Sequence, residues 1–148
     1  MIYFDTSALV KRFVNETGSH LVQSLVQGAN AVATAKIAYA EIYAGLTRKL
    51  RDGNLSKPRY TVACRQFESD WGAYVRVELT DELLLMARDL IQRHPLKGFD
   101  AVHLASALQL KTALDEEIRF AAADKNLLKA AQGEELEAIN VEAALGSK

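Results

Sequence analysis

The chain has 148 residues, of which 49% are hydrophobic and 25% are charged. These proportions are typical of one ordinary water-soluble globular domain, long enough to bury a core of its own. Eighteen Lys and Arg residues against nineteen Asp and Glu residues give a formal net charge of −1. This balance excludes a protein that binds nucleic acid through a strongly basic arm.

The sequence also excludes several structural devices. Its one cysteine, Cys64, cannot form an intrachain disulfide, and with three scattered histidines it cannot complete a structural zinc site. No apolar run approaches ~18 residues, and the first residues lack the charged segment of a signal peptide. Because no Gly/Ser-rich stretch marks a linker, we expect a single domain over residues 1–148, located in the cytoplasm and not in a membrane.

Apolar runs and helical periodicities alternate along the chain. In chain order we expect a strand at 2–4, a helix from 8 to about 14, a helix near 21–28, a strand at 31–33, a helix at 35–50, a helix from 58 to about 71, a strand at 75–79, a helix from 80, a helix from 99 to about 111, a strand at 120–123, a helix near 127–133 and a strand at 136–141. Alternating strands and helices predict an α/β fold with helices layered around a central, mostly parallel sheet.

Several of these elements begin or end at residues that cap or break helices. Thr6 or Ser7 can cap the first helix, and Thr80 can cap the helix that follows it. Gly28 is placed to end the second helix, and Asp52-Gly53-Asn54 breaks the helix expected at 35–50.

Four acidic residues stand where the pattern would favour an apolar or neutral one. Asp5 and Asp124 each follow a predicted strand, at the end where α/β sheets place their ligand crevices. Glu41 borders the apolar face of its helix, and Asp100 begins a helix that is apolar nearly all round. Each has a structural alternative: a helix cap for Asp5, a surface ion pair with Arg48 for Glu41, and a favourable helix dipole for Asp100.

A parallel sheet can bring all four acids to one edge, and four carboxylates in a partly dry cleft repel one another strongly. No lysine or arginine is interleaved closely enough with the four motifs to offset the charge of all four acids. Oxygen ligands without histidine or cysteine suit Mg²⁺ or Mn²⁺. A divalent ion that activates a water beside phosphate oxygens is the chemistry of phosphodiester hydrolysis.

The acids lie in four short motifs. They are Phe4-Asp5-Thr6-Ser7, Tyr39-Ala40-Glu41-Ile42-Tyr43-Ala44-Gly45-Leu46, Phe99-Asp100-Ala101-Val102-His103-Leu104-Ala105 and Ala123-Asp124-Lys125. In this order and spacing, over essentially the whole chain, the sequence resembles PIN-domain proteins of the VapC type, the toxin ribonucleases of type II toxin–antitoxin pairs.

The resemblance implies a three-layer α/β/α sandwich and endonucleolytic cleavage of RNA. It implies that Asp5, Glu41, Asp100 and Asp124 bind Mg²⁺ or Mn²⁺, with Ser7 orienting a carboxylate or a water beside them. It also implies two partners besides the RNA substrate, a small antitoxin encoded nearby and a second copy of the chain in a homodimer.

Basic residues concentrate in residues 36–65, which hold seven of them against two acids. Six are candidates for contacts to RNA phosphates: Lys36, Arg48, Lys49, Arg51, Lys57 and Arg59. The alternative is a solvated helical hairpin that contacts no ligand. His103, three residues after Asp100, is interpreted as a packed or capping histidine rather than a ligand, and Phe67, Trp71 and Tyr74 as core or a dimer patch.

Two other functions stay open at this stage. The first is a PIN-fold module that binds RNA or protein without cleaving it, which the departures from the family pattern at Ala122 and Leu127 would favour. The second is a phosphoryl-transfer fold with Asp5 as nucleophile. Dehalogenase-like phosphatases place a second aspartate two residues on, where this chain has Ser7, and this disfavours them.

Overall fold

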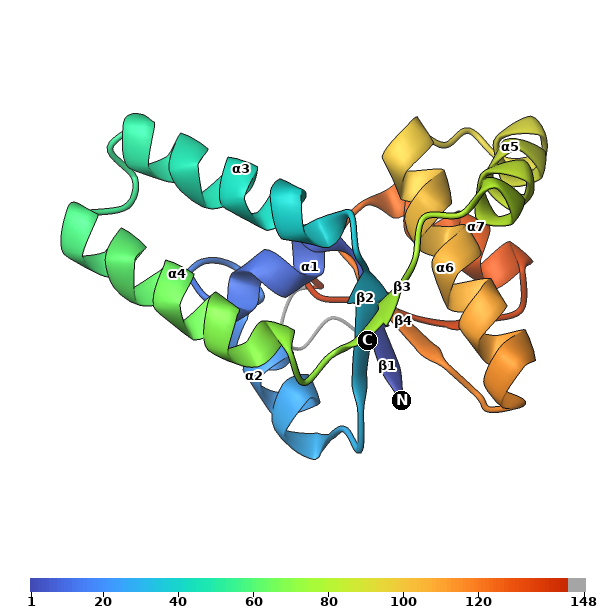
Figure 1. Ribbon diagram of the computed structural model, residues 1–148, viewed down its shortest axis with the longest axis horizontal. Coiled ribbons are helices and arrows are strands. Elements are labelled where there is room, and N and C mark those ends of the chain that lie inside the picture. The colour runs from blue at the N-terminus through green and yellow to red at the C-terminus, as the bar shows by residue number, and fades with distance from the viewer. Residues whose placement is uncertain (144–148) are drawn as a thin grey trace.

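A five-stranded sheet lies between two layers of helices in the computed structural model, which describes residues 1–143 (Figure 1). The strands are β1 (Ile2–Phe4), β2 (Val32–Ala35), β3 (Val75–Val77), β4 (Arg119–Ala122) and β5 (Glu137–Asn140). They are arranged in the order β3-β2-β1-β4-β5, and every neighbouring pair is parallel. The predicted α/β/α sandwich is therefore confirmed, with a sheet that is parallel throughout.

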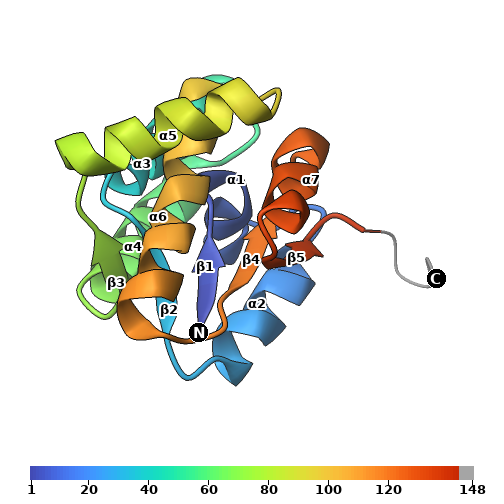
Figure 2. The same cartoon turned by 90° about the vertical axis from the view of Figure 1, so that its right-hand side faces the viewer.

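The helices divide between the two faces of this sheet. They are α1 (Thr6–Leu9), the 3₁₀ turn η1 (Val10–Arg12), α2 (Ser19–Gly28), α3 (Ala38–Arg51), α4 (Lys57–Trp71), α5 (Asp81–Arg93), α6 (Gly98–Leu114) and α7 (Lys125–Gly133). One face is covered by α1 to α4, and α3 and α4 form a long hairpin at the left of Figure 1. Figure 2 shows α5, α6 and α7 over the opposite face.

The alternation of side chains along β1 supplies both cores. Ile2 and Phe4 pack under α1 to α4, whereas Tyr3 between them points toward α6, because successive side chains of a strand lie on opposite faces. All three are fully buried, as expected of the central strand of a parallel sheet. Of the aromatic residues interpreted as core or a dimer patch, Phe67 and Tyr74 are buried in the cluster under α4, and Trp71 is partly buried against it.

Helix α6 is buried along most of its length, because it lies between the sheet and α5. Its residues 101–107 are all buried, which agrees with an apolar pattern that shows no polar face. Burial on every side also brings a histidine, His103, into the interior with 1% of its surface exposed.

Most predicted boundaries differ by a few residues from those observed, and the first helix, expected to end at about residue 14, ends at Leu9 and is followed by η1 to Arg12. The first helix begins at Thr6, because the side chain of Asp5 accepts the Ala8 N–H and caps it, so neither Thr6 nor Ser7 is the cap. The second strand occupies residues 32–35 rather than 31–33. Thr80 caps α5 as predicted, accepting the Leu83 N–H at 3.1 Å. Within residues 1–143, no helix is long and apolar enough to cross a membrane.

Gly18, the residue before α2, fits closely against the residue that follows β5. It has a φ of +93°, and a Cβ there would lie 2.4 Å from the carbonyl oxygen of Val141. Gly53, in the turn after α3, has a similar φ of +78° but nothing within 4 Å of a Cβ. The two glycines share the same backbone requirement, but only Gly18 is also packed against a neighbouring segment.

We expect Gly53→Ala to lower the free energy of unfolding by about 1–2 kcal/mol, the cost of a side chain in the left-handed region. Gly18→Ala should lose a further ~1–3 kcal/mol from forced displacement of the packed backbone. Urea unfolding of both variants checks this difference. Equal losses at the two sites would show that the contact with Val141 is not tight.

Candidate active site

The four acids lie at the carboxyl edge of the sheet. Asp5 directly follows β1, and Asp124 is separated from the adjacent strand β4 by one residue. The strand order reverses between these two strands, since the chain builds β2 and β3 on one side of β1 and β4 and β5 on the other. Such a reversal opens a crevice at the carboxyl ends of the strands. Glu41 and Asp100 enter it from the first turns of α3 and α6.

Asp5 is the most deeply placed of the four, with 3% of its surface exposed. Its carboxylate accepts the Ala8 N–H at 2.9 Å and the Ser7 hydroxyl at 2.8 and 2.9 Å. The Ser7 Oγ in turn accepts the backbone N–H of Ala123 at 3.3 Å. Ser7 therefore links the end of β1 to the segment that carries Asp124, and it orients the Asp5 carboxylate.

Burial and mutual repulsion oppose ionisation of two of the acids. Burial raises the pKa of Asp5 to about 6, against the opposing effects of His103 and of the hydrogen bonds from Ala8 and Ser7. Burial also raises the pKa of Asp100, and the negative charge of Asp124 raises it further. These shifts place Asp100 within electrostatic reach of both Asp5 and Asp124.

Glu41 has a different environment. Burial alone would raise its pKa, but hydrogen bonds from His103 and Thr6 outweigh burial and lower that pKa below its ordinary value. The Thr6 hydroxyl donates to Glu41 Oε1 at 2.6 Å, and His103 Nε2 lies 2.9 Å from the same oxygen. The alternative of a surface ion pair between Glu41 and Arg48 was therefore wrong.

Asp124 has a structural role as well as a place at the edge. It is exposed, and its carboxylate caps α7 by accepting the Leu127 N–H at 2.9 Å. The cap leaves one carboxylate oxygen, Oδ1, without a hydrogen bond from the residues between 1 and 143.

The donor set at this edge fits a hard divalent cation, because it offers carboxylate oxygens with no thiolate. The raised pKa values of Asp5 and Asp100 fit it too, since a cation would offset the charge that burial and repulsion disfavour. In residues 1–143, however, no three His, Cys, Asp or Glu side chains are already close enough to form a complete ligand group. The carboxylates share the edge without being drawn together into a finished site.

A hollow of about 840 Å³ adjoins two of the acids. Glu41 and Asp100 line it at one side, and α5 lines it with Leu84, Arg88 and Ile91. Two cations, Arg88 and Lys97, also line the hollow, and most of its remaining lining residues are apolar.

The six basic candidates divide into one residue at the acidic edge and five along the hairpin. Lys36 follows β2 and pairs with Glu78. The others lie on α3 and α4: Arg48, Lys49, Arg51, Lys57 and Arg59. At 1.5 Å per residue, Arg48 and Arg51 lie roughly 10–15 Å from Glu41 along the axis of α3.

The positive charge of the hairpin reaches solvent through only part of this cluster. Lys49 forms an ion pair with Glu16, with 2.8 Å between Nζ and Oε2, whereas Arg48 and Arg51 are exposed. Both helices of the hairpin extend away from the sheet (Figure 1). A ligand that contacts the exposed arginines and the acids together must therefore be extended, as a single-stranded nucleic acid is.

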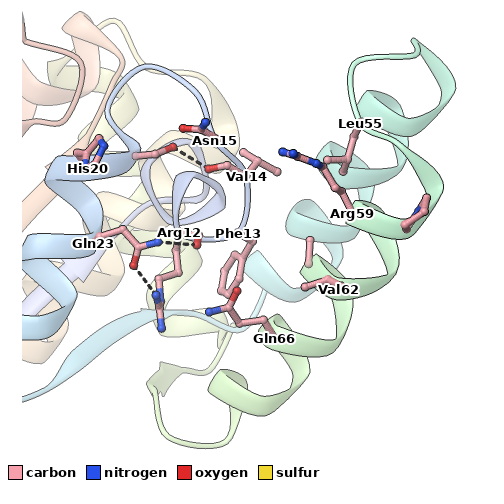
Figure 3. A pocket seen from close by; sticks show the side chains of 13 residues that line it. Arg12, Phe13, Val14, Asn15, His20, Gln23, Leu55, Arg59, Val62 and Gln66 are labelled. Carbon is pink, nitrogen blue, oxygen red and sulfur yellow. Dashed lines mark hydrogen bonds between the residues drawn. The ribbon is translucent and has the colours of Figure 1, made fainter.

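Arg59 also lines a second hollow, of about 500 Å³, on the other side of the hairpin. Figure 3 shows Arg59 and Val62 on one wall of this hollow and Arg12, Phe13 and His20 across from them. None of the four acids lines this hollow, so it is separate from the candidate active site.

Sequence reasoning missed the contribution of Thr6 and His103 to the site. His103 is a packed histidine as predicted, but it also contacts Glu41. One signal for this was available, because a residue three positions after Asp100 lies on the same face of a helix. The link to Glu41 itself joins residues 62 positions apart, which no local pattern reports.

Comparison with known proteins agrees with this architecture. Two relatives from Mycobacterium tuberculosis, Ribonuclease VapC45 and Ribonuclease VapC49, are each 42% identical to the chain over 108 residues, covering 73% of it and 75% of each relative. A toxin–antitoxin complex from Klebsiella pneumoniae contains a chain with the same fold, with a TM-score of 0.67 and 16% identity over 95% of this chain and 98% of that one. The family model for the PIN domain matches residues 2–133, and the chain therefore belongs to the PIN domain family.

Proposed function

We propose that the protein is a divalent-metal-dependent endoribonuclease and the toxin of a VapBC-type toxin–antitoxin pair. The observation that carries this proposal is that Asp5, Glu41, Asp100 and Asp124 lie at the carboxyl edge of the sheet, where the strand order reverses. Burial and repulsion between the acids raise the pKa of Asp5 and Asp100 there. Relatives that are 42% identical bear the name ribonuclease, which supports RNA as the substrate.

The residues at the edge have different roles in this proposal. Asp5 and Asp100 would hold Mg²⁺ or Mn²⁺, with Glu41 and Asp124 completing the set and Ser7 orienting Asp5. When bound, the cation supplies charge neutralisation at the scissile phosphate and activation of the attacking water. The hydrogen bond from Ser7 keeps the Asp5 carboxylate facing the edge, and the cap on Ala8 fixes it to the start of α1.

Two partners accompany this function. A small antitoxin would occlude the acidic edge, placing a basic side chain among the carboxylates, and the solved complex from Klebsiella pneumoniae supports such a partner by its description as a toxin–antitoxin complex. A second copy of the chain would complete a homodimer. We place the protein in the cytoplasm, where its RNA substrates are.

Asp5→Asn and Asp100→Asn should each lower Mg²⁺-dependent RNA cleavage by at least about 100-fold, because loss of a metal-binding carboxylate costs more than loss of an outer partner. Asn at position 5 can still cap α1. Asp81→Asn is the matched control, since Asp81 also lies in the first turn of a helix but is exposed on α5. Full activity in folded Asp5→Asn and Asp100→Asn proteins would refute the assignment.

Calorimetric titration with Mn²⁺ separates the nuclease from a PIN-fold module that only binds RNA or protein. We expect heat from Mn²⁺ uptake by the wild-type protein and a loss of that uptake in Asp100→Asn. Chelation by EDTA should abolish RNA cleavage, and added Mn²⁺ should restore it. A wild-type protein that binds RNA but takes up no Mn²⁺ would instead be the binding module.

The basic residues of the hairpin give a separate prediction. Replacing Arg48 and Arg51 by Gln should weaken binding of single-stranded RNA and lower the slope of log affinity against log salt by about 0.7 for each phosphate that is no longer neutralised. Lys111→Gln with Lys129→Gln is the control, since it removes two cations on α6 and α7. Binding is measured in Asp100→Asn protein, so that the RNA stays intact. Equal slopes in the two double variants would favour the solvated hairpin.

A further inference from the structure

A line of hydrogen bonds joins the interior of the protein to one carboxylate of the acidic edge. The Tyr3 hydroxyl lies 2.7 Å from His103 Nδ1, and His103 Nε2 lies 2.9 Å from Glu41 Oε1. The Thr6 hydroxyl reaches the same Glu41 oxygen at 2.6 Å. These four side chains come from β1, α6, α3 and α1, so the line ties together both helical layers and the sheet.

The contacts assign the direction of each bond. A carboxylate only accepts, so His103 carries its proton on Nε2 and donates it to Glu41. In the tautomer that carries its proton on Nε2, Nδ1 is an acceptor, and the Tyr3 hydroxyl donates to it. The Thr6 hydroxyl has one proton, which goes to Glu41. The line therefore runs from Tyr3 through His103 to Glu41.

The inner part of this line is rigid. Tyr3 is fully buried and His103 is 1% exposed. The Tyr3 ring stacks on Phe120, with centroids 5.5 Å apart and planes 4° apart, and meets the His103 ring edge-on at 5.8 Å. The Thr6 hydroxyl also lies 3.1 Å from His103 Nε2, so Thr6, His103 and Glu41 contact one another. Turning Glu41 away would break its hydrogen bonds with both Thr6 and His103.

Both hydrogen bonds enter through Oε1, and no residue between 1 and 143 donates to Oε2. The carboxylate is thus held by one oxygen while the other is left for a ligand at the edge. Without this hold, a half-buried glutamate on a first helical turn would have several rotamers open to it.

We propose that His103 and Tyr3 are positioning residues, which fix Glu41 so that it binds the divalent cation with little loss of side-chain freedom. The inference rests on the proposed function, because it concerns affinity for the metal of that site. Partners that orient a ligand in this way are worth about 10–100-fold in metal affinity.

The test is Mn²⁺ affinity by calorimetry in four variants whose folding is checked by circular dichroism. His103→Leu should weaken binding about 10–100-fold. His103→Gln should recover most of the loss, because its amide nitrogen can donate from nearly the position of Nε2. In a Glu41→Ala background, His103→Leu should cause no further loss, since a residue that acts only through Glu41 has nothing left to act on.

His94→Leu is the matched control. His94 also contacts a carboxylate, with Nε2 2.7 Å from Glu134, but it lies at the end of α5 and does not line the hollow beside Glu41 and Asp100. Its replacement should leave the Mn²⁺ affinity unchanged. If His103→Leu does not fold, Tyr3→Phe takes its place with the same expected direction, because loss of the Tyr3 hydroxyl removes the donor that fixes the imidazole tautomer.

The ¹⁵N shifts of the His103 imidazole in the metal-free protein give a readout that does not depend on the cation. They should show a proton on Nε2, and Tyr3→Phe should alter the shifts. An Nε2 without a proton overturns the inference, because it then has nothing to donate to Glu41. So does Mn²⁺ affinity that is unchanged in His103→Leu or equally reduced in the Glu41→Ala background. If the wild-type protein takes up no Mn²⁺, both the proposed function and this inference fail. If the wild-type protein binds Mn²⁺ but His103→Leu binds it equally well, only this inference fails.

Discussion

β1 lies at the centre of a sheet whose strands all run parallel, and this constraint determines where the chemistry can occur. The residue after a central strand is carried to the middle of the carboxyl edge, where the strand order reverses and the helices diverge. Asp5 occupies that position and is buried there. Asp124 follows the neighbouring strand β4, so the connectivity of the sheet alone brings two carboxylates from opposite ends of the chain to one place.

The surroundings then give the acids different properties. Asp5 is buried and would be protonated more readily than an ordinary aspartate. Glu41 is stabilised as a carboxylate, because Thr6 and His103 both donate to it. Asp100 is partly buried, and both this burial and the negative charge of Asp124 raise its pKa. A site built in this way has one acid held ionised in advance and others whose ionisation a bound cation would favour.

The same core that stabilises the fold also holds the site. Helix α6 packs against the sheet and α5 along its whole buried stretch, and this packing fixes both Asp100 at its start and His103 one turn later. Tyr3, the one residue of β1 that faces α6, is at once a core residue stacked on Phe120 and the donor to His103. The same side chains therefore stabilise the fold and set the geometry of the site. In a site carried on surface loops, by contrast, the site residues do not belong to the core.

By itself the sequence determined the order of the elements, the α/β class and the positions of all four acids, because periodicity, caps and strand ends are local properties. It could not assign the partners of Glu41. Thr6 and His103 are 35 and 62 positions away from it, and the local candidate, Arg48, proved wrong. Hydrogen bonds between distant segments depend on how whole elements pack. Only the tertiary structure, in which α1, α3 and α6 surround the end of β1, therefore decided that Thr6 and the buried His103 hold Glu41 in place.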